Sequence, residues 1–97
     1  RPDMPISQDA ISLYIAQNIG EMFGKTPYQN IYVIDGDDEL LMHHEERIRF
    51  FAYKKNVVFY TADQFTEAYK QNQLTKTDSI FISTREMDTS KFSNIQT

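Results

Sequence analysis

The 97-residue sequence contains no cysteine, only three glycines and no long hydrophobic run. The absence of cysteine excludes disulfides, thiolate catalysis and zinc sites with cysteine ligands. No apolar run approaches the roughly 18–20 residues that a membrane-spanning helix needs. The three glycines form neither a GxGxxG motif nor a P-loop, so the chain lacks the usual backbone cradle for phosphate groups. These absences argue against thiol enzymes, zinc ribbons and nucleotide-binding proteins.

What is present indicates one small acidic domain. Ten Lys and Arg stand against fourteen Asp and Glu, and hydrophobic residues make up 40% of the chain. This length and composition allow one core but not two domains. The net charge of −4 argues against nucleic acid as the main partner. The chain begins at Arg1 without an initiator Met or a signal-peptide pattern, so we expect a piece of a longer or processed polypeptide.

The first predicted element is a helix that follows an irregular entry over residues 1–6. Ser7 is a candidate N-cap, and Gly24 followed by Pro27 is typical of a helix stop. Between these positions, apolar residues recur at spacings of three and four, which predicts one inward stripe. The stripe consists of Ile11, Tyr14, Ile15, Ile19, Met22 and Phe23.

Three short apolar runs, at residues 31–34, 57–60 and 80–82, predict strands. Between the first two runs, a helical pattern over residues 39–55 places four residues on one inward face, and Asn56 is a candidate left-handed terminator. That face consists of Leu41, His44, Ile48 and Phe51.

A third helix is predicted between the second and third strands. Thr61 and Gln64 form a capping-box pattern that opens it, and it frays near Gln73. Its predicted inward residues are Phe65, Ala68 and Tyr69.

The element order is therefore α-β-α-β-α-β. Short, almost wholly apolar strands favour parallel pairing with crossover helices. We predict an α/β fold, a three-layer Rossmann-like half unit with a three-stranded parallel sheet, as a single domain over residues 7–84. Strand orders 2-1-3 and 3-2-1 both remain open, and residues 85–97 are predicted to form a loose C-terminal tail.

Candidate chemistry lies where the strands end, because ligands bind beyond the carboxyl ends of parallel strands. The candidate binding residues are Asp35, Asp37, Asp38, Glu39 and Thr61. Carboxylates are the oxygen ligands that Mg²⁺ prefers, so Asp35 and Asp37 are the candidate metal ligands. The favoured interpretation is a polar strand-to-helix turn with no cofactor, and Mg²⁺ is the alternative.

The acidic loop also resembles the nucleophile loop of haloacid-dehalogenase-type phosphatases, in which a strand is followed by Asp, any residue and Asp. In that family the first Asp attacks phosphorus and the second acts as acid and base. The resemblance implies these roles for Asp35 and Asp37. The sequence departs from the family at Glu39, where the family has Thr.

Two further groups favour structural interpretations. His43 and His44 are adjacent, so on a regular helix their side chains point about 100° apart and do not readily bind one ion. We expect His44 to be partly buried and His43 to be solvated. Five aromatic residues near the second strand are expected to form core with some surface exposure. They are Phe50, Phe51, Tyr53, Phe59 and Tyr60.

The order and spacing of the elements resemble the soluble extramembrane C-terminal domain of GT-C-type polytopic membrane glycosyltransferases, of the mannosyltransferase and aminoarabinose-transferase kind. The segments that carry the resemblance are residues 11–18, 31–35, 49–57, 63–73 and 78–84. In that family the catalytic acid lies between membrane spans, so the resemblance implies no catalytic residue in this chain.

The resemblance implies a non-catalytic domain of a larger membrane enzyme that uses lipid-linked sugars. Its partner would be the membrane-embedded part of the parent chain, on the extracytoplasmic side, with a packing or acceptor-contact role. It predicts an exposed apolar or aromatic patch near Tyr53 or Tyr60. Two alternatives remain: a Mg²⁺-dependent phosphotransfer or receiver-like module that uses residues 35–39, and a free-standing protein-interaction domain.

Overall fold

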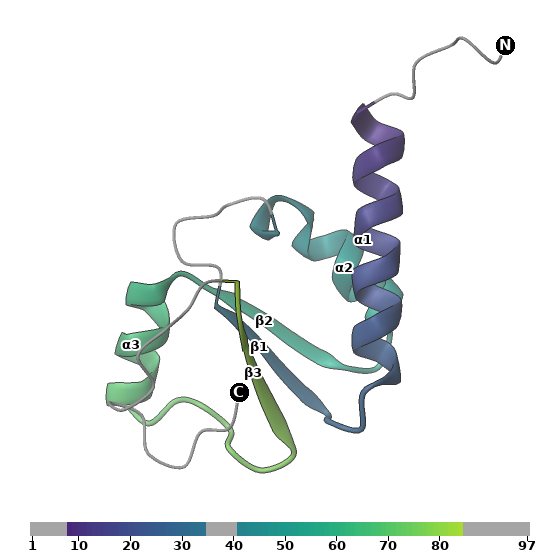
Figure 1. The fold of residues 1–97 in the computed structure, drawn as a ribbon. Helices are drawn as coiled ribbons and strands as arrows, with labels where there is room; N and C mark the ends of the chain where they lie inside the picture. Colours follow the sequence, from purple (N-terminus) through teal and green to yellow (C-terminus); the bar gives the residue numbers. More distant parts are fainter. Residues whose placement is uncertain (1–7, 35–40, 85–97) are drawn as a thin grey trace, which may run out of the picture.

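The structure is a computed structural model that describes residues 8–34 and 41–84 of the chain. The predicted entry (1–6), the candidate N-cap Ser7, the acidic loop (35–39) and the tail (85–97) lie outside these ranges. Figure 1 shows the described elements in chain order. They are α1 (Gln8–Lys25), β1 (Asn30–Ile34), the 3₁₀ turn η1 (Met42–His44), α2 (Glu45–Ala52), β2 (Asn56–Tyr60), α3 (Ala62–Lys70) and β3 (Ser79–Ser83).

The three strands form a parallel sheet in the order β2-β1-β3, which confirms the predicted α/β fold and resolves the strand order. The central strand, β1, pairs Tyr32 with Val58 of β2 and with Phe81 of β3. Because parallel neighbours need crossover connections, α2 links β1 to β2 and α3 links β2 to β3.

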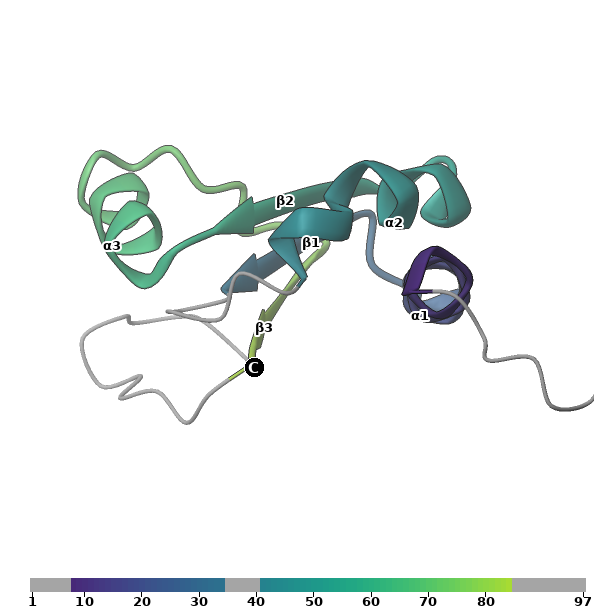
Figure 2. The same cartoon turned by 90° about the horizontal axis from the view of Figure 1, so that it is seen from above.

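The helices cover opposite faces of the sheet, so the molecule has three layers. Alternate residues of a strand point to opposite faces. Ile31 and Val33 of β1 belong to a core with α1 and α2, whereas Tyr32 and Ile34 belong to a core with α3. Figure 2 shows α2 beside α1, and α3 apart from them, with the strands between.

The predicted inward stripe of α1 is partly wrong. Phe23 is buried and Ile19 packs at the border of the core, but Tyr14 and Met22 are exposed, and the other buried residues are Ala16 and Gly20, which the stripe did not include. A Cβ atom on Gly20 would lie 2.5 Å from the Cβ of Phe51 and 2.6 Å from the carbonyl oxygen of Ile48. α1 therefore packs on α2 through small residues, which a search for large apolar side chains overlooks.

The predicted helix stops also differ from the structure. Gly24 lies inside α1 without a left-handed backbone, and the hydroxyl of Thr26 donates to the carbonyl of Phe23 at 2.9 Å. The predicted helix over residues 39–55 is shorter in its described part, as η1 followed by α2. It ends where Tyr53 adopts φ 59°, so Tyr53 rather than Asn56 carries the positive φ.

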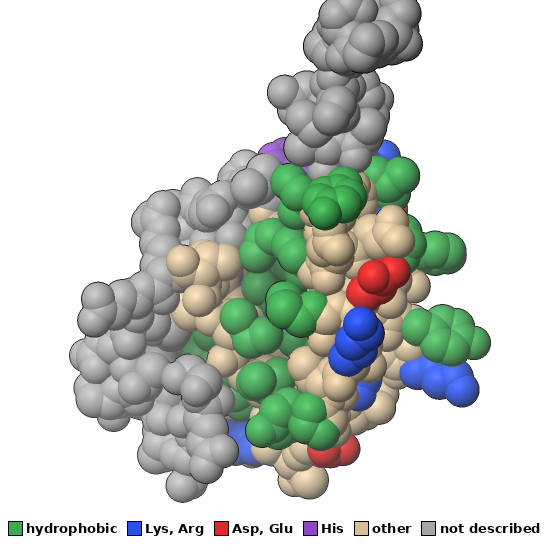
Figure 3. Space-filling model, turned by 45° about the vertical axis from the view of Figure 1, so that its right-hand side comes forward, with side chains coloured by type: hydrophobic (Ala, Val, Ile, Leu, Met, Phe, Trp, Pro, Cys, Tyr) green, Lys and Arg blue, Asp and Glu red, His purple; other side chains and the backbone are tan. Residues whose placement is uncertain are grey.

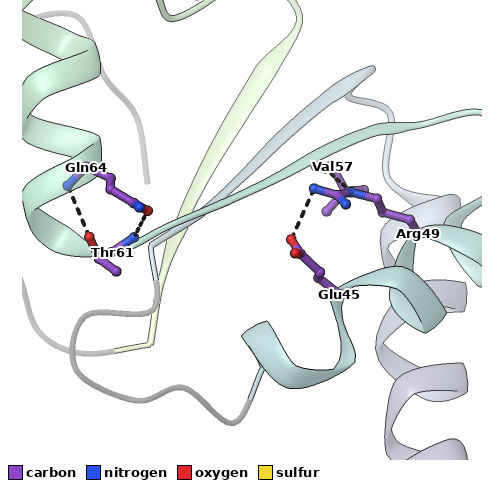
Figure 4. Close-up of polar contacts among 5 residues, drawn as sticks. All are labelled: Glu45, Arg49, Val57, Thr61 and Gln64. Atoms are coloured by element: carbon purple, nitrogen blue, oxygen red, sulfur yellow. Dashed lines mark hydrogen bonds and ion pairs between the residues drawn. The ribbon is translucent and has the colours of Figure 1, made fainter.

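Two side-chain bonding patterns fix the ends and edges of the sheet (Figure 4). The predicted capping box is confirmed, because Thr61 and Gln64 each bond the other's backbone N–H. On the other side, Arg49 of α2 donates from Nε to the carbonyl of Val57 at 2.9 Å and pairs with Glu45 at 3.1 Å. Arg49 thus covers part of the edge strand β2. Unpaired backbone groups on an edge strand can otherwise pair with strands of other chains.

Candidate functional site

The carboxyl edge of the sheet is where sequence analysis predicts a ligand. Ile34 stands between Tyr60 and Ser83 at the ends of the three strands, so the chain leaves the centre of the sheet after residue 34. The crossovers on the two sides of β1 run over opposite faces, and this arrangement opens a crevice in parallel sheets. The candidate residues Asp35, Asp37, Asp38 and Glu39 lie outside the described residues.

Thr61 is the one candidate binding residue that the structure describes. Its hydroxyl oxygen accepts the backbone N–H of Gln64 at 3.1 Å, and the Gln64 side chain accepts the Thr61 N–H at 3.0 Å. This reciprocal pair satisfies two backbone donors at the start of α3. The structure therefore gives Thr61 a defined structural role in the helix cap.

The histidines lie in the segment that leads into α2. His43 is exposed and His44 is half-buried, as expected. His44 stands at the N-cap of α2 without a side-chain cap bond. Within residues 8–34 and 41–84, no group of three or more His, Asp or Glu side chains could hold a metal ion.

Tyr60 is the ionisable residue with a perturbed environment near the carboxyl edge. Burial raises its pKa above the ordinary value of 10.0, and repulsion from Tyr32 adds to the effect. The two rings stack at 6.1 Å, with an interplanar angle of 15°. The Tyr60 phenol therefore holds its proton to higher pH than a free tyrosine does.

The exposed large apolar side chains of the described residues come from the side of the sheet that α1 and α2 cover. In the described part of the chain, the large hydrophobic residues that are exposed all belong to α1, to α2 or to the residue that follows α2. They are Leu13 (46% exposed), Tyr14 (70%), Met22 (58%), Phe50 (75%) and Tyr53 (78%).

One part of this side is a surface that we call the aliphatic strip, made of Ile15, Ile19 and Met22 of α1 with Ile80 and Ile82 of β3. The α1 residues follow at intervals of four and three and so share one helix face. Ile19, Ile80 and Ile82 pack at the border of the same core and remain partly exposed. Figure 3 shows apolar side chains in a band alongside α1.

A second part is a shallow groove between the end of α1 and the end of α2. It has a volume of about 370 Å³ and is lined by Glu21, Gly24 and Lys25 together with residues 51–55. The Lys55 ammonium reaches across and donates to the carbonyls of Thr26 and Tyr28 at 2.8 and 2.9 Å. These two hydrogen bonds join the end of α2 to the segment that follows α1.

Sequence analysis located part of this surface. An exposed patch was expected near Tyr53 or Tyr60, and Tyr53 is exposed whereas Tyr60 is half-buried. The aliphatic strip was not predicted from the sequence. The sequence pattern of α1 could have indicated the strip. The apolar stripe predicted for this helix is broader than contact with one neighbouring helix requires.

Comparison of the chain with known protein families, curated proteins and solved structures gives no significant match. The resemblance to glycosyltransferase domains stays a prediction. In residues 8–34 and 41–84, no helix combines the length and apolar character needed to cross a bilayer.

Proposed function

We propose that this chain is a non-catalytic domain of a larger membrane protein and that it docks on the membrane-embedded part of its parent. In this proposal the parent is a glycosyltransferase that uses lipid-linked sugars, and the domain lies on the extracytoplasmic side. Its role is to pack against the parent or to contact the acceptor. The observation that supports the proposal best is the aliphatic strip.

The strip supports docking because three of its members, Ile19, Ile80 and Ile82, border the same core and stay partly exposed. Isolated exposed apolar residues are ordinary on protein surfaces, but a contiguous patch marks an interaction site. Met22 is exposed, while Ile19 and Ile82 are half-buried at the edge of the core. A partner that covers this edge of the core would complete the burial of Ile19 and Ile82.

The proposed partner is apolar and aliphatic, as a protein helix at a membrane surface is. The strip residues carry no charge, and β3 consists of Ser79, three apolar residues and Ser83. A charged or nucleic-acid partner would find no complementary group along the strip.

Fractionation of source cells, followed by a blot with an antibody against this chain, tests the proposal. We expect a band much heavier than 11.4 kDa in the membrane fraction, because the domain belongs to a larger protein. A band near 11.4 kDa in the supernatant would contradict the proposal.

The second candidate function is a Mg²⁺-dependent module that uses the acidic loop. It is favoured by the position at which this loop begins, beyond the central strand and between crossovers on opposite faces. Millimolar Mg²⁺ should then shift the backbone amide signals of residues 35–39 saturably, and Asp35→Asn should abolish the shift. Spectra that stay unchanged would eliminate this candidate.

A further inference from the structure

We propose that the end of α2 is a lipid contact, in which Phe50, Tyr53 and Lys54 enter the headgroup region of an anionic bilayer. This inference rests on the proposed function, because it assigns a bilayer as the second surface that the docked domain touches. It concerns the aromatic end of α2 and not the aliphatic strip.

The first observation is the backbone of Tyr53. Its φ and ψ are 59° and −105°, and the Lys55 N–H bonds the Ala52 carbonyl across it at 3.4 Å. These values match the first central position of a type II′ turn, which glycine normally occupies because a Cβ atom is strained there. A large aromatic residue thus holds a position that suits glycine.

The second observation is that packing does not explain this choice. The Tyr53 side chain is 78% exposed, and the Lys54 ammonium lies over its ring, 5.5 Å from the ring centre. Lys54 is itself exposed. Strained residues that burial does not require are typical of sites that serve a function.

The third observation is a second exposed aromatic residue at the end of α2. Phe50 precedes it by three residues, is 75% exposed, and packs edge-on against Phe51 at 5.2 Å. Phe50 belongs to the last turn of α2 and Tyr53 directly follows the helix, so two exposed aromatic residues mark this helix end. Aromatic rings with a polar partner are the residues that prefer the boundary between water and lipid.

The charges near these rings favour an anionic surface. The exposed bases are Lys25, Arg47, Arg49 and Lys54, of which Arg49 pairs with the half-buried Glu45, against the exposed acids Glu21 and Glu46. This region therefore has more bases than acids, although the whole chain has a net charge of −4. Lysine stems can lie along an apolar surface while the ammonium groups reach lipid phosphates.

The chain has no tryptophan, so a single introduced indole reports on one position. We would add the Tyr53→Trp variant to phosphatidylcholine vesicles with and without phosphatidylglycerol and record its emission. The expected result is a blue shift and quenching by brominated lipid, both stronger with phosphatidylglycerol. No shift with either vesicle would overturn the inference.

Tyr69→Trp is the matched control. Tyr69 also has a lysine over its ring, Lys76 at 5.2 Å, but it lies on α3, across the sheet from α2. We expect its emission to stay unchanged when vesicles are added. An equal shift at both positions would contradict a contact through the end of α2.

Tyr53→Gly separates binding from folding. Glycine suits the turn, so the variant should unfold at the same or a higher temperature than the parent chain. It should bind phosphatidylglycerol vesicles about tenfold more weakly, because one aromatic side chain no longer enters the bilayer. Lys54→Gln should weaken binding about fivefold, the effect of one basic charge near an anionic surface. Unchanged binding in both variants would overturn the inference.

The two proposals fail separately. A heavy band in the membrane fraction, combined with no vesicle binding by this chain, would contradict only the lipid contact. A light band in the supernatant, combined with vesicle binding, would contradict only the larger membrane protein.

Discussion

Each face of the sheet has a buried core, but the two faces differ in the residues that remain exposed around it. On the α3 face, Phe65 and Phe81 are buried and the partly exposed residues adjoin them. On the α1/α2 face, Phe50, Tyr53 and Met22 are exposed, and Ile19, Ile80 and Ile82 stay partly exposed at the border of the core. This difference in exposure is the basis for proposing that the α1/α2 face, rather than the α3 face, docks on a partner.

The α3 face closes through aromatic contacts. The Tyr32 and Phe81 rings stack at 5.1 Å, and Phe65 meets Phe81 edge-on at 5.8 Å. The Tyr32 hydroxyl accepts the backbone N–H of Thr75 at 2.9 Å, which satisfies its polar end. The α1/α2 face relies on Gly20, where two helix backbones approach closely, and this leaves the flank of α1 uncovered by α2.

The largest contrast should appear when one phenylalanine is removed from each face. Phe65→Ala should destabilise the fold by about 3–5 kcal/mol, because it empties a fully buried site. Phe50→Ala should change stability by less than about 0.5 kcal/mol, as exposed positions do. Urea unfolding followed by circular dichroism measures both. A comparable loss at Phe50 would show that this ring belongs to the folding core.

Two glycines of α1 sharpen the account of the helix contact. Gly20→Ala should cost about 1–3 kcal/mol, because its Cβ would collide with α2 at 2.5 Å. Gly24→Ala is the matched control, since its nearest atom, the Ala52 carbonyl oxygen, would lie at an ordinary 3.5 Å. It should gain up to about 1 kcal/mol from helix propensity. Equal effects of the two changes in thermal unfolding would contradict the close approach.

The cap of α3 should have a moderate effect. Thr61→Ala removes the acceptor of the Gln64 N–H and should cost about 1 kcal/mol, whereas Thr61→Ser keeps the oxygen and should cost little. If both variants unfold at the same urea concentration as the parent chain, the capping bond contributes nothing to stability.

The smallest effect is the alkaline response of the α3 face. The pKa of Tyr60 is higher in the folded chain than its ordinary value of 10.0, so the unfolded chain releases this proton first. The stability due to the protonated phenol is therefore complete below pH 10 and declines as the pH rises towards the folded pKa. Tyr60→Phe should show a weaker decline above pH 10 in unfolding experiments. An identical decline would assign the effect to other groups.

The sequence predicted the architecture because its local signals agree. The apolar runs became the three strands, and Thr61 with Gln64 became the cap of α3. The order β2-β1-β3 could not be predicted, since local patterns do not determine which strands become neighbours. The helix stops at Gly24 and Asn56 were wrong because tertiary contacts decide where a helix ends. Gly24 lies inside α1 and faces Ala52 of α2. In the turn after α2, Tyr53 is the residue with the positive φ.

Less of the functional surface could be predicted. Tyr53 was anticipated as part of an exposed patch, and its positive φ was not, because glycine or asparagine is the residue expected there. The aliphatic strip can be found only from the folded structure, because Ile19 of α1 and Ile82 of β3 are distant in sequence and pack at the border of the same core. The Asp35, Asp37, Asp38 and Glu39 candidates remain a prediction from the sequence.

Photo-cross-linking in the source cells tests the difference between the two faces most directly. A photoreactive phenylalanine analogue would replace Met22 in the strip or, as the control, the exposed Glu67 of α3. The account predicts links from position 22 to the membrane-embedded part of the parent chain, identified by mass spectrometry of the joined peptides, and none from position 67. Links from position 67 alone, or equal links from both positions, would contradict it.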